Sequence, residues 1–282
     1  MSYRPSELRL QREAARHRAS RRSTLIAVGS TLLIGIVLTV GITGAPGFDR
    51  VRQSFFSAHY ARTSFPHVLS GLWLNLRVMV IAEIFVLIFG LLIALARTSK
   101  SPVLYPVRLL ATFYTDTFRG LPLLLVLYLV GFGVAGLQIS WIPNSAVILG
   151  TISLILTYTA YVAEVIRAGI EAVNPAQRMA ARALGLSQVQ TQLHVVLPQA
   201  LRKVTPPLLN DLVSLQKDSG LISVLGAIDA IRAAGIETAQ SFNFTPYVVA
   251  GALFVLLTIP LTRFTDWLTR KQDRARVQQG QW

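Results

Sequence analysis

The 282-residue chain contains no cysteine. Disulfides, thiol nucleophiles, iron–sulfur clusters and zinc sites built from cysteines are therefore excluded. Charged residues are also scarce, at 14% of the chain, against roughly 25% in soluble domains. Hydrophobic residues make up 52%, and several apolar runs are long enough to cross a bilayer as helices. This composition predicts an all-α membrane protein.

Acidic residues are few, with 13 Asp and Glu against 27 Lys and Arg and a formal net charge of +14. A charge of this size raises the question of nucleic-acid binding, but no basic stripe interleaved with aromatics lies in a soluble domain. The basic residues instead gather at the ends of apolar runs, as the positive-inside rule predicts. We therefore interpret the charge as a signal for membrane orientation.

The apolar runs predict six membrane spans, at about 24–44, 69–96, 107–135, 145–169, 206–228 and 246–267. The segments assigned to the cytoplasmic side carry 20 Lys and Arg, and those assigned to the outside carry four. This bias predicts that both termini are cytoplasmic. No internal repeat is visible, so the inverted-repeat architecture of many secondary transporters lacks its expected support.

The chain before the second span divides into three predicted segments. Residues 1–23 carry seven arginines and are interpreted as a basic cytoplasmic anchor, with a dedicated lipid-binding helix as the alternative. Residues 24–44 are predicted to be an uncleaved transmembrane helix, because the apolar run is too long for a signal peptide. Residues 45–67 are predicted to form an external loop, with a short interfacial helix inside it left open, and residues 269–282 at the other end a cytoplasmic tail.

The polar stretch 177–198, QRMAARALGLSQVQTQLHVVLP, lies between long apolar segments in the second half of the chain. Its alanines favour a helix, which Gly185 is predicted to break. Ser187 is a candidate cap for a second helix, with Gln190 completing a capping box. The apolar residues of this second helix recur at spacings of three and four, and Pro198 is predicted to end it. A helix pair of this kind is suited to docking into a groove on a soluble partner.

This stretch resembles the EAA signature of permease subunits of bacterial ABC importers. The matching residues are Ala180, Ala181, Gly185, Val195, Leu197 and Pro198, while Met179 stands where the signature usually has glutamate. Three further segments are similar to the polar amino-acid branch of that family: FRGLPLL, TAYVAEVIRAGI and LPQALRKVTPPLLNDLVSLQKDSGL, at 118–124, 159–170 and 197–221. The resemblance covers about residues 68–268.

The resemblance implies a five-helix permease core at 68–268, preceded by one extra span, in a bacterial cytoplasmic (inner) membrane. It implies two ATPase subunits, a second permease subunit of the same or a related kind, and an extracytoplasmic solute-binding protein as partners. ATP and magnesium would be bound by the ATPase, and no cofactor by this chain. The residues implied to couple the permease to the ATPase are Met179, Ala180, Ala181, Gly185, Leu186, Leu193 and Pro198. The chain also lacks a glycine-rich phosphate loop ending in Gly-Lys-Ser or Gly-Lys-Thr.

Ionisable residues inside predicted spans are the candidates for a solute path, because such residues are costly in lipid. The candidates are Arg77, Glu83, Glu164, Lys217 and Asp218. Charges of both signs suit a zwitterionic amino acid. The alternative is that these residues pair with one another and hold helices together, as Glu164 and Arg167 would at a spacing of three.

We therefore predict a non-enzymatic permease subunit of an ATP-driven importer for glutamate, glutamine or a basic amino acid. The alternative is a gradient-driven secondary transporter or channel, which explains intramembrane charges but not the stretch 177–198. An intramembrane hydrolase would need a nucleophile–base pair that the sequence does not offer. The four histidines are scattered and no H-E-x-x-H motif occurs, so no metal site is predicted.

Overall fold

The computed structural model describes residues 7–99, 101–140 and 143–278, with side chains between residues 23 and 271. Its described elements are all helical. Four helices are long and apolar enough to cross a membrane, or up to six if each of two bent helix pairs forms one span. The predicted all-α membrane fold is confirmed. Residues 1–6 and 279–282 of the predicted cytoplasmic segments lie outside the described residues.

The chain divides into two units, residues 1–56 and 57–282. The first contains α1 (Glu7–Thr43) and α2 (Phe48–Phe55). The apolar part of α1, Ser23–Thr43, has 21 residues and every side chain exposed, and at 1.5 Å per residue it is long enough to cross a bilayer. The hydroxyls of Thr31, Thr39 and Thr43 donate to carbonyls four residues back, at 2.8, 2.7 and 2.8 Å. These bonds satisfy the polar groups of a helix that is otherwise apolar.

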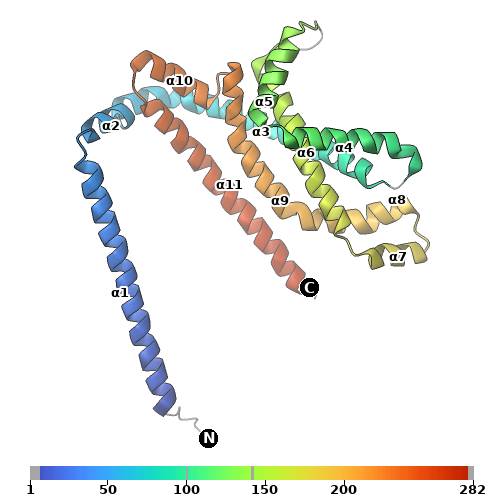
Figure 1. The fold of residues 1–282 in the computed structure, drawn as a ribbon, viewed down its shortest axis with the longest axis horizontal. Helices are drawn as coiled ribbons and strands as arrows, with labels where there is room; N and C mark the ends of the chain where they lie inside the picture. The colour runs from blue at the N-terminus through green and yellow to red at the C-terminus, as the bar shows by residue number, and fades with distance from the viewer. Residues whose placement is uncertain (1–6, 100, 141–142, 279–282) are drawn as a thin grey trace. The chain divides into compact units, whose positions relative to one another are not determined.

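The second unit is a bundle of long helices joined by short ones (Figure 1). Its elements are α3 (Ala58–Thr98), η1 (Pro102–Leu104), α4 (Tyr105–Gly120), α5 (Leu123–Tyr128), η2 (Leu129–Val134), α6 (Ala146–Glu171), α7 (Pro175–Ala183), α8 (Gln188–Gln190), η3 (Thr191–Val196), α9 (Leu197–Asp218), η4 (Ser219–Leu225), α10 (Ala230–Ser241) and α11 (Thr245–Gln278). Residues 58–67, predicted as part of an external loop, are instead the first turns of α3.

The core of the bundle lies where α3, α6 and α9 meet. Val86, Leu154 and Leu215 are fully buried there. Gly90 allows α3 to approach α6 closely, since a β-carbon at this position would lie 2.6 Å from Cγ1 of Val162. In a bilayer the lipid tails are as apolar as the side chains, so helix association depends on this kind of close packing and on hydrogen bonds between helices.

The third predicted span, 107–135, is not one straight helix. The segments 102–120 and 123–134 meet at an angle of 108°. Leu121 has an extended backbone, with φ −92° and ψ 134°, and Pro122 follows it. Proline disfavours helical geometry in the residue before it, so the chain turns at this point although the apolar run continues.

The fifth predicted span also differs from the expectation. The helical segment 188–225 is followed by α10, bent by 49°, in the stretch between the predicted spans 206–228 and 246–267. Asp229 caps α10, its Oδ1 accepting a hydrogen bond from the backbone N–H of Arg232 at 2.8 Å. Ala230 and Ala234 of α10 are buried against Val68 and Leu72 of α3, so this segment belongs to the packed bundle.

Candidate functional site

The helix pair formed by residues 175–196, here called the α7–α8 hairpin, lies at one edge of the second unit (Figure 1). Asn174 caps α7 by accepting from the backbone N–H of Ala176 at 2.9 Å. The helix ends at Gly185, whose φ is +86°. The N–H of Gly185 bonds to the carbonyl of Arg182 at 3.0 Å, and that of Leu186 to Ala181 at 3.2 Å. This pair of bonds is a Schellman motif, and it confirms the predicted break at Gly185.

The second helix of the hairpin starts with the predicted capping box. The backbone N–H of Gln190 donates to Oγ of Ser187 at 3.2 Å, and the backbone N–H of Ser187 donates to Oε1 of Gln190 at 2.8 Å. Two N–H groups that the helix cannot satisfy internally are thus paired. With Gly185 before it, this cap fixes the direction in which the second helix leaves the turn.

The prediction that Pro198 ends this second helix is wrong. The chain stays helical from α8 through η3 and α9 to Asp218, and Pro198 is the second residue of α9. The preceding turn, η3, is a π-helix. Proline cannot supply the hydrogen bond to the residue four positions back and crowds its carbonyl, and the wider π turn accommodates this. The hairpin is therefore joined to the core of the bundle by continuous helix.

Four apolar side chains of the hairpin are exposed, among exposed polar residues. Met179, Leu184, Val189 and Leu193 are 65%, 81%, 66% and 48% exposed. Ala181 is buried and Leu186 half-buried, whereas Ala180 and Gly185 are exposed. The structure thus divides the predicted coupling residues into an outward set and an inward set.

Two basic side chains bind the end of α6, one from the hairpin and one from α9. The guanidinium of Arg178, on α7, donates to the carbonyl of Ile170. Nζ of Lys203, on α9, donates to the carbonyl of Ala172 at 2.6 Å. Both carbonyls lie at the C-terminal end of α6, where the helix dipole favours cations. The hairpin is therefore bonded to the end of α6 and continuous with α9.

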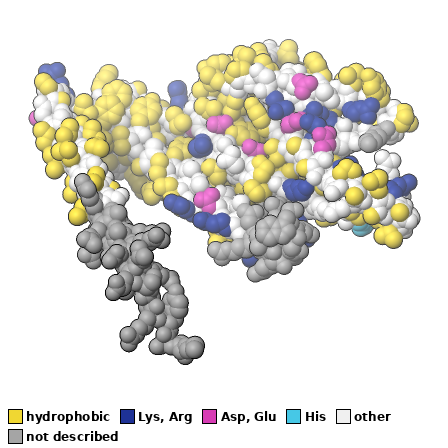
Figure 2. Space-filling view, turned by 60° about the horizontal axis from the view of Figure 1, so that its bottom comes forward, with side chains coloured by type: hydrophobic (Ala, Val, Ile, Leu, Met, Phe, Trp, Pro, Cys, Tyr) yellow, Lys and Arg dark blue, Asp and Glu magenta, His cyan; other side chains and the backbone are white. Residues whose placement is uncertain are grey.

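Seven residues before that end, Glu164 joins three helices through one carboxylate. Its Oε2 accepts from Nη1 of Arg97 on α3 at 2.7 Å and lies 3.7 Å from Nη1 of Arg119 on α4. Its Oε1 accepts from Nη2 of Arg167 at 2.5 Å. Arg167 also donates to both oxygens of Glu171 at 2.6 Å. The predicted pairing of Glu164 with Arg167 is confirmed; Figure 2 shows acidic and basic side chains side by side on a largely hydrophobic face.

A second acidic group lies where α3, α6 and α9 meet. The hydroxyl of Tyr158 donates to Oδ2 of Asp218 at 2.8 Å. Asp211 has a buried Oδ2 without a hydrogen-bond partner among the described residues, and Glu83 is near enough to interact with it electrostatically. Asp211 and Tyr158 were not among the predicted path residues. The spacing of seven between Asp211 and Asp218, two helical turns, is the signal that places both on one face.

Two predicted path residues lie apart from this group. Arg77 is exposed and lines a pocket of about 390 Å³ between α3 and α6, with Val78, Ile81 and Val147 among its apolar walls. Lys217 is exposed on α9. Neither forms an ion pair within the described part of the chain, so the structure does not bring all five candidates together.

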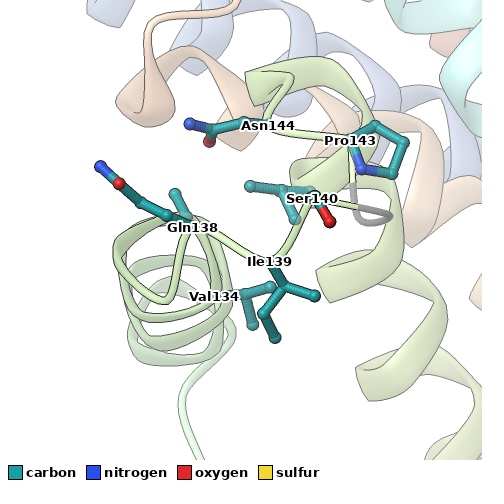
Figure 3. Close-up of a pocket in the computed structure, with 8 residues that line it drawn as sticks. Val134, Gln138, Ile139, Ser140, Pro143 and Asn144 are labelled. Carbon is teal, nitrogen blue, oxygen red and sulfur yellow. The ribbon is translucent and has the colours of Figure 1, made fainter.

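A further pocket of about 450 Å³ lies between the end of η2 and the start of α6 (Figure 3). The polar side chains of Gln138 and Asn144 lie on the same side of it, and Val134 and Ile139 form an apolar wall. None of the described residues that line this pocket has an ionisable side chain. Within residues 23–99, 101–140 and 143–271, no group of three His, Asp or Glu is placed to hold a metal ion.

Comparison with known proteins gives one family. Residues 87–274 match the profile of the family described as "Binding-protein-dependent transport system inner membrane component". The chain is 38% identical over 205 residues to the putative glutamine transport system permease protein of Rickettsia conorii, covering 72% of this chain and 92% of that one. It is 35% identical over 210 residues to the arginine transport system permease protein of Bacillus subtilis, covering 73% and 92%.

Solved structures agree with the sequence matches. A crystal structure of an amino acid ABC transporter with histidines is 34% identical, covers 73% of this chain and 94% of that chain, and has a TM-score of 0.66. A bacterial ABC transporter that imports alginate shares the fold at 16% identity, with a TM-score of 0.63.

Proposed function

The chain belongs to the family of binding-protein-dependent transport system inner membrane components, and from this premise we propose that it imports a polar amino acid. The energy for this import comes from an ATPase that docks on the α7–α8 hairpin. As a multi-pass permease subunit of an ABC importer in the inner membrane, the chain is a transport component rather than an enzyme. The family implies ATPase subunits, permease subunits and a binding protein as partners in general.

The α7–α8 hairpin is the observation that carries the proposed coupling. Its turn is held by the Schellman motif at Gly185 and by the capping box at Ser187. Met179 and Leu184 are the most exposed large apolar side chains of α7 and its end, whereas Val189 and Leu193 line a pocket with Leu95 of α3 and Leu104 of η1. A fixed helix pair with exposed apolar side chains fits a groove on a soluble partner. Because continuous helix connects it to α9 and Arg178 connects it to α6, movement of the partner would be applied to two core helices at once.

The partner set that we propose is specific. Two ATPase subunits bind ATP and magnesium, a second permease subunit of the same or a related kind completes the path, and an extracytoplasmic solute-binding protein delivers the cargo. The hairpin then faces the cytoplasm, where ATP is, and both termini are on that side. The distribution of Lys and Arg along the chain supports this orientation.

The group formed by Glu83, Asp211 and Asp218 is our proposal for the part of the path that contacts the cargo. Its carboxylates lie at the meeting point of three core helices. Carboxylates form strong hydrogen bonds with ammonium and guanidinium groups, so this group would bind the amino group of an amino acid or the side chain of a basic one. The named relatives, a putative glutamine permease and an arginine permease, support a polar amino acid as the class of cargo.

The test is uptake in proteoliposomes that contain this chain, a candidate ATPase and its binding protein. Labelled glutamine, glutamate and arginine are supplied outside with ATP inside, and vesicles carrying an ATPase unable to hydrolyse ATP are the control. We expect uptake only with active ATPase and binding protein present. Uptake driven by an ion gradient without ATP would instead support a secondary transporter or channel.

A further inference from the structure

The hairpin and the part of α9 up to Asn210 contain no carboxylate. From Ala172 to Asn210 the sequence has no Asp or Glu, and it has three arginines and one lysine. The nearest acidic residues, Glu171 and Asp211, lie at its two ends, and Glu171 is paired with Arg167. Any partner that docks on this segment therefore meets only apolar, polar neutral and cationic groups.

The two arginines of α7 differ in their exposure and in their hydrogen bonds. Arg178 is half-buried and bound to the carbonyl of Ile170, so it serves the contact with α6. Arg182 is exposed, and its Nη1 donates to the carbonyl of Leu186 at 2.6 Å. That bond uses one of five N–H donors of a guanidinium and holds it beside the Gly185 turn. Arg182 has no carboxylate partner in the described part of the chain.

Met179 lies on the same face of α7 as Arg182. The two residues are three apart, which brings their side chains together on a helix. Met179 is 65% exposed, and Leu184 at the end of the same helix is 81% exposed. The outward surface of α7 thus presents Met179 beside the guanidinium of Arg182, with Leu184 at the end of the helix.

We infer that the ATPase partner presents a groove with an apolar floor and an acidic rim, in which Met179 and Leu184 are buried and Arg182 pairs with a rim carboxylate. This inference rests on the proposed function and adds the chemistry of the docking surface. Methionine adapts its shape to fill an irregular apolar pocket. A glutamate at position 179 would be desolvated in that pocket and would compete with the rim carboxylates for the guanidinium of Arg182, and like charges brought together at an interface are costly.

The first arm of the test is a pair of substitutions at one position. In the proteoliposome complex that supports ATP-dependent uptake, Met179→Leu should lower solute-stimulated ATP hydrolysis much less than Met179→Glu does, since volume-conserving apolar changes are tolerated better than a buried charge. Met179→Glu should reduce the solute-stimulated ATP hydrolysis by at least about tenfold, as expected for a carboxylate buried next to the carboxylates of the partner. Co-purification of the ATPase with the permease should fall in parallel. Equal or higher coupling in Met179→Glu, which restores the residue usual in the EAA signature, would overturn the inference.

The second arm measures charge complementarity through salt dependence. Salt screens exposed ion pairs, so the wild-type complex should lose ATPase as the salt concentration rises. Arg182→Gln keeps a donor for the carbonyl of Leu186 but removes the charge, and it should flatten this dependence. If the ATPase activity of Arg182→Gln fell with rising salt as steeply as that of the wild type, the partner would have no acidic rim that pairs with Arg182. If the wild-type chain and Met179→Leu both fail to couple to any ATPase, the proposed function itself fails, and the two failures are thereby distinguished.

Discussion

The side-chain Nδ2 of Asn75 on α3 donates to Oδ2 of Asp229 at the start of α10 across 3.0 Å, and both residues are buried. The same Nδ2 donates to the carbonyl of Ser219 at 2.9 Å, and Oδ1 of Asn75 accepts from the backbone N–H of Ala230 at 3.1 Å. One amide thereby satisfies polar groups on both sides of the break between η4 and α10. Buried polar groups of this kind are costly when a partner is removed.

The first prediction concerns this amide. Asn75→Leu keeps the approximate volume but removes every hydrogen bond of the side chain, which leaves the Asp229 carboxylate and the N–H of Ala230 short of partners. Each buried group without a partner costs about 1–3 kcal/mol, so the variant should be clearly destabilised. Thermal unfolding of the purified protein in detergent measures this loss. The same change at the exposed Asn210 is the matched control, and equal losses in the two variants would contradict the assignment.

The second prediction concerns the ion pairs around Glu164. Glu164→Gln leaves Arg97 without its carboxylate, and the Arg97 side chain is only 10% exposed. Breaking one partner of a buried pair costs roughly 3–5 kcal/mol, and partial exposure of Glu164 places the expected loss at or below the lower end of that range. Thermal unfolding again gives the measurement.

Glu171→Gln is the control for this second prediction. The carboxylate of Glu171 is 56% exposed and pairs with Arg167 at 2.6 Å. Exposed pairs of this type contribute about 0–1 kcal/mol. If Glu171→Gln destabilised the protein as much as Glu164→Gln does, the ion pairs of Glu164 with α3 and α4 would be no more stabilising than an exposed pair.

The third prediction concerns the turn of the hairpin. Gly185→Pro forces φ to about −65°, whereas the native value is +86°, and it removes the N–H that bonds to the carbonyl of Arg182. The protein should still insert into the membrane, because the apolar spans are unchanged, but solute-stimulated ATP hydrolysis should be lost. Gly185→Asn is the comparison, since asparagine adopts left-handed geometry more readily than other residues with a side chain. Normal stimulation in the proline variant would contradict the role of this turn in coupling.

The parts of the hairpin that were predicted correctly are local. The break at Gly185 and the capping box at Ser187 each depend on partners within five residues, so the spacing of residue types is sufficient to predict them. The helix through Pro198 was not predicted, because it depends on packing that buries Val196 and Ala200 on either side of the proline. Burial of that kind is decided by distant segments.

Hydropathy predicted which segments are apolar enough to cross a membrane, but not where the backbone turns within such a segment. The apolar run continues across Leu121 and Pro122, so a search for apolar length treated residues 107–135 as one span, although the backbone turns there by 108°. Asn75 and Asp229 are 154 residues apart, and no short-range pattern connects them. The same holds for Arg97, which meets Glu164 across 67 residues of sequence.

The last prediction concerns the close contact between Gly169 of α6 and Val204 of α9. A β-carbon at Gly169 would overlap Cγ1 of Val204 and lie 3.3 Å from the carbonyl oxygen of Ala200. Gly169→Ala should therefore destabilise the protein by about 1–3 kcal/mol, as overpacking does. Gly251→Ala is the matched control, because a β-carbon there meets no neighbour within 4 Å. Val204→Ala removes the overlapping methyl groups, so the double variant Gly169→Ala/Val204→Ala should recover part of the loss. A double-mutant cycle of thermal unfolding measures that recovery, and two purely additive losses would mean that the close approach of α6 and α9 at Gly169 does not limit what this position accepts.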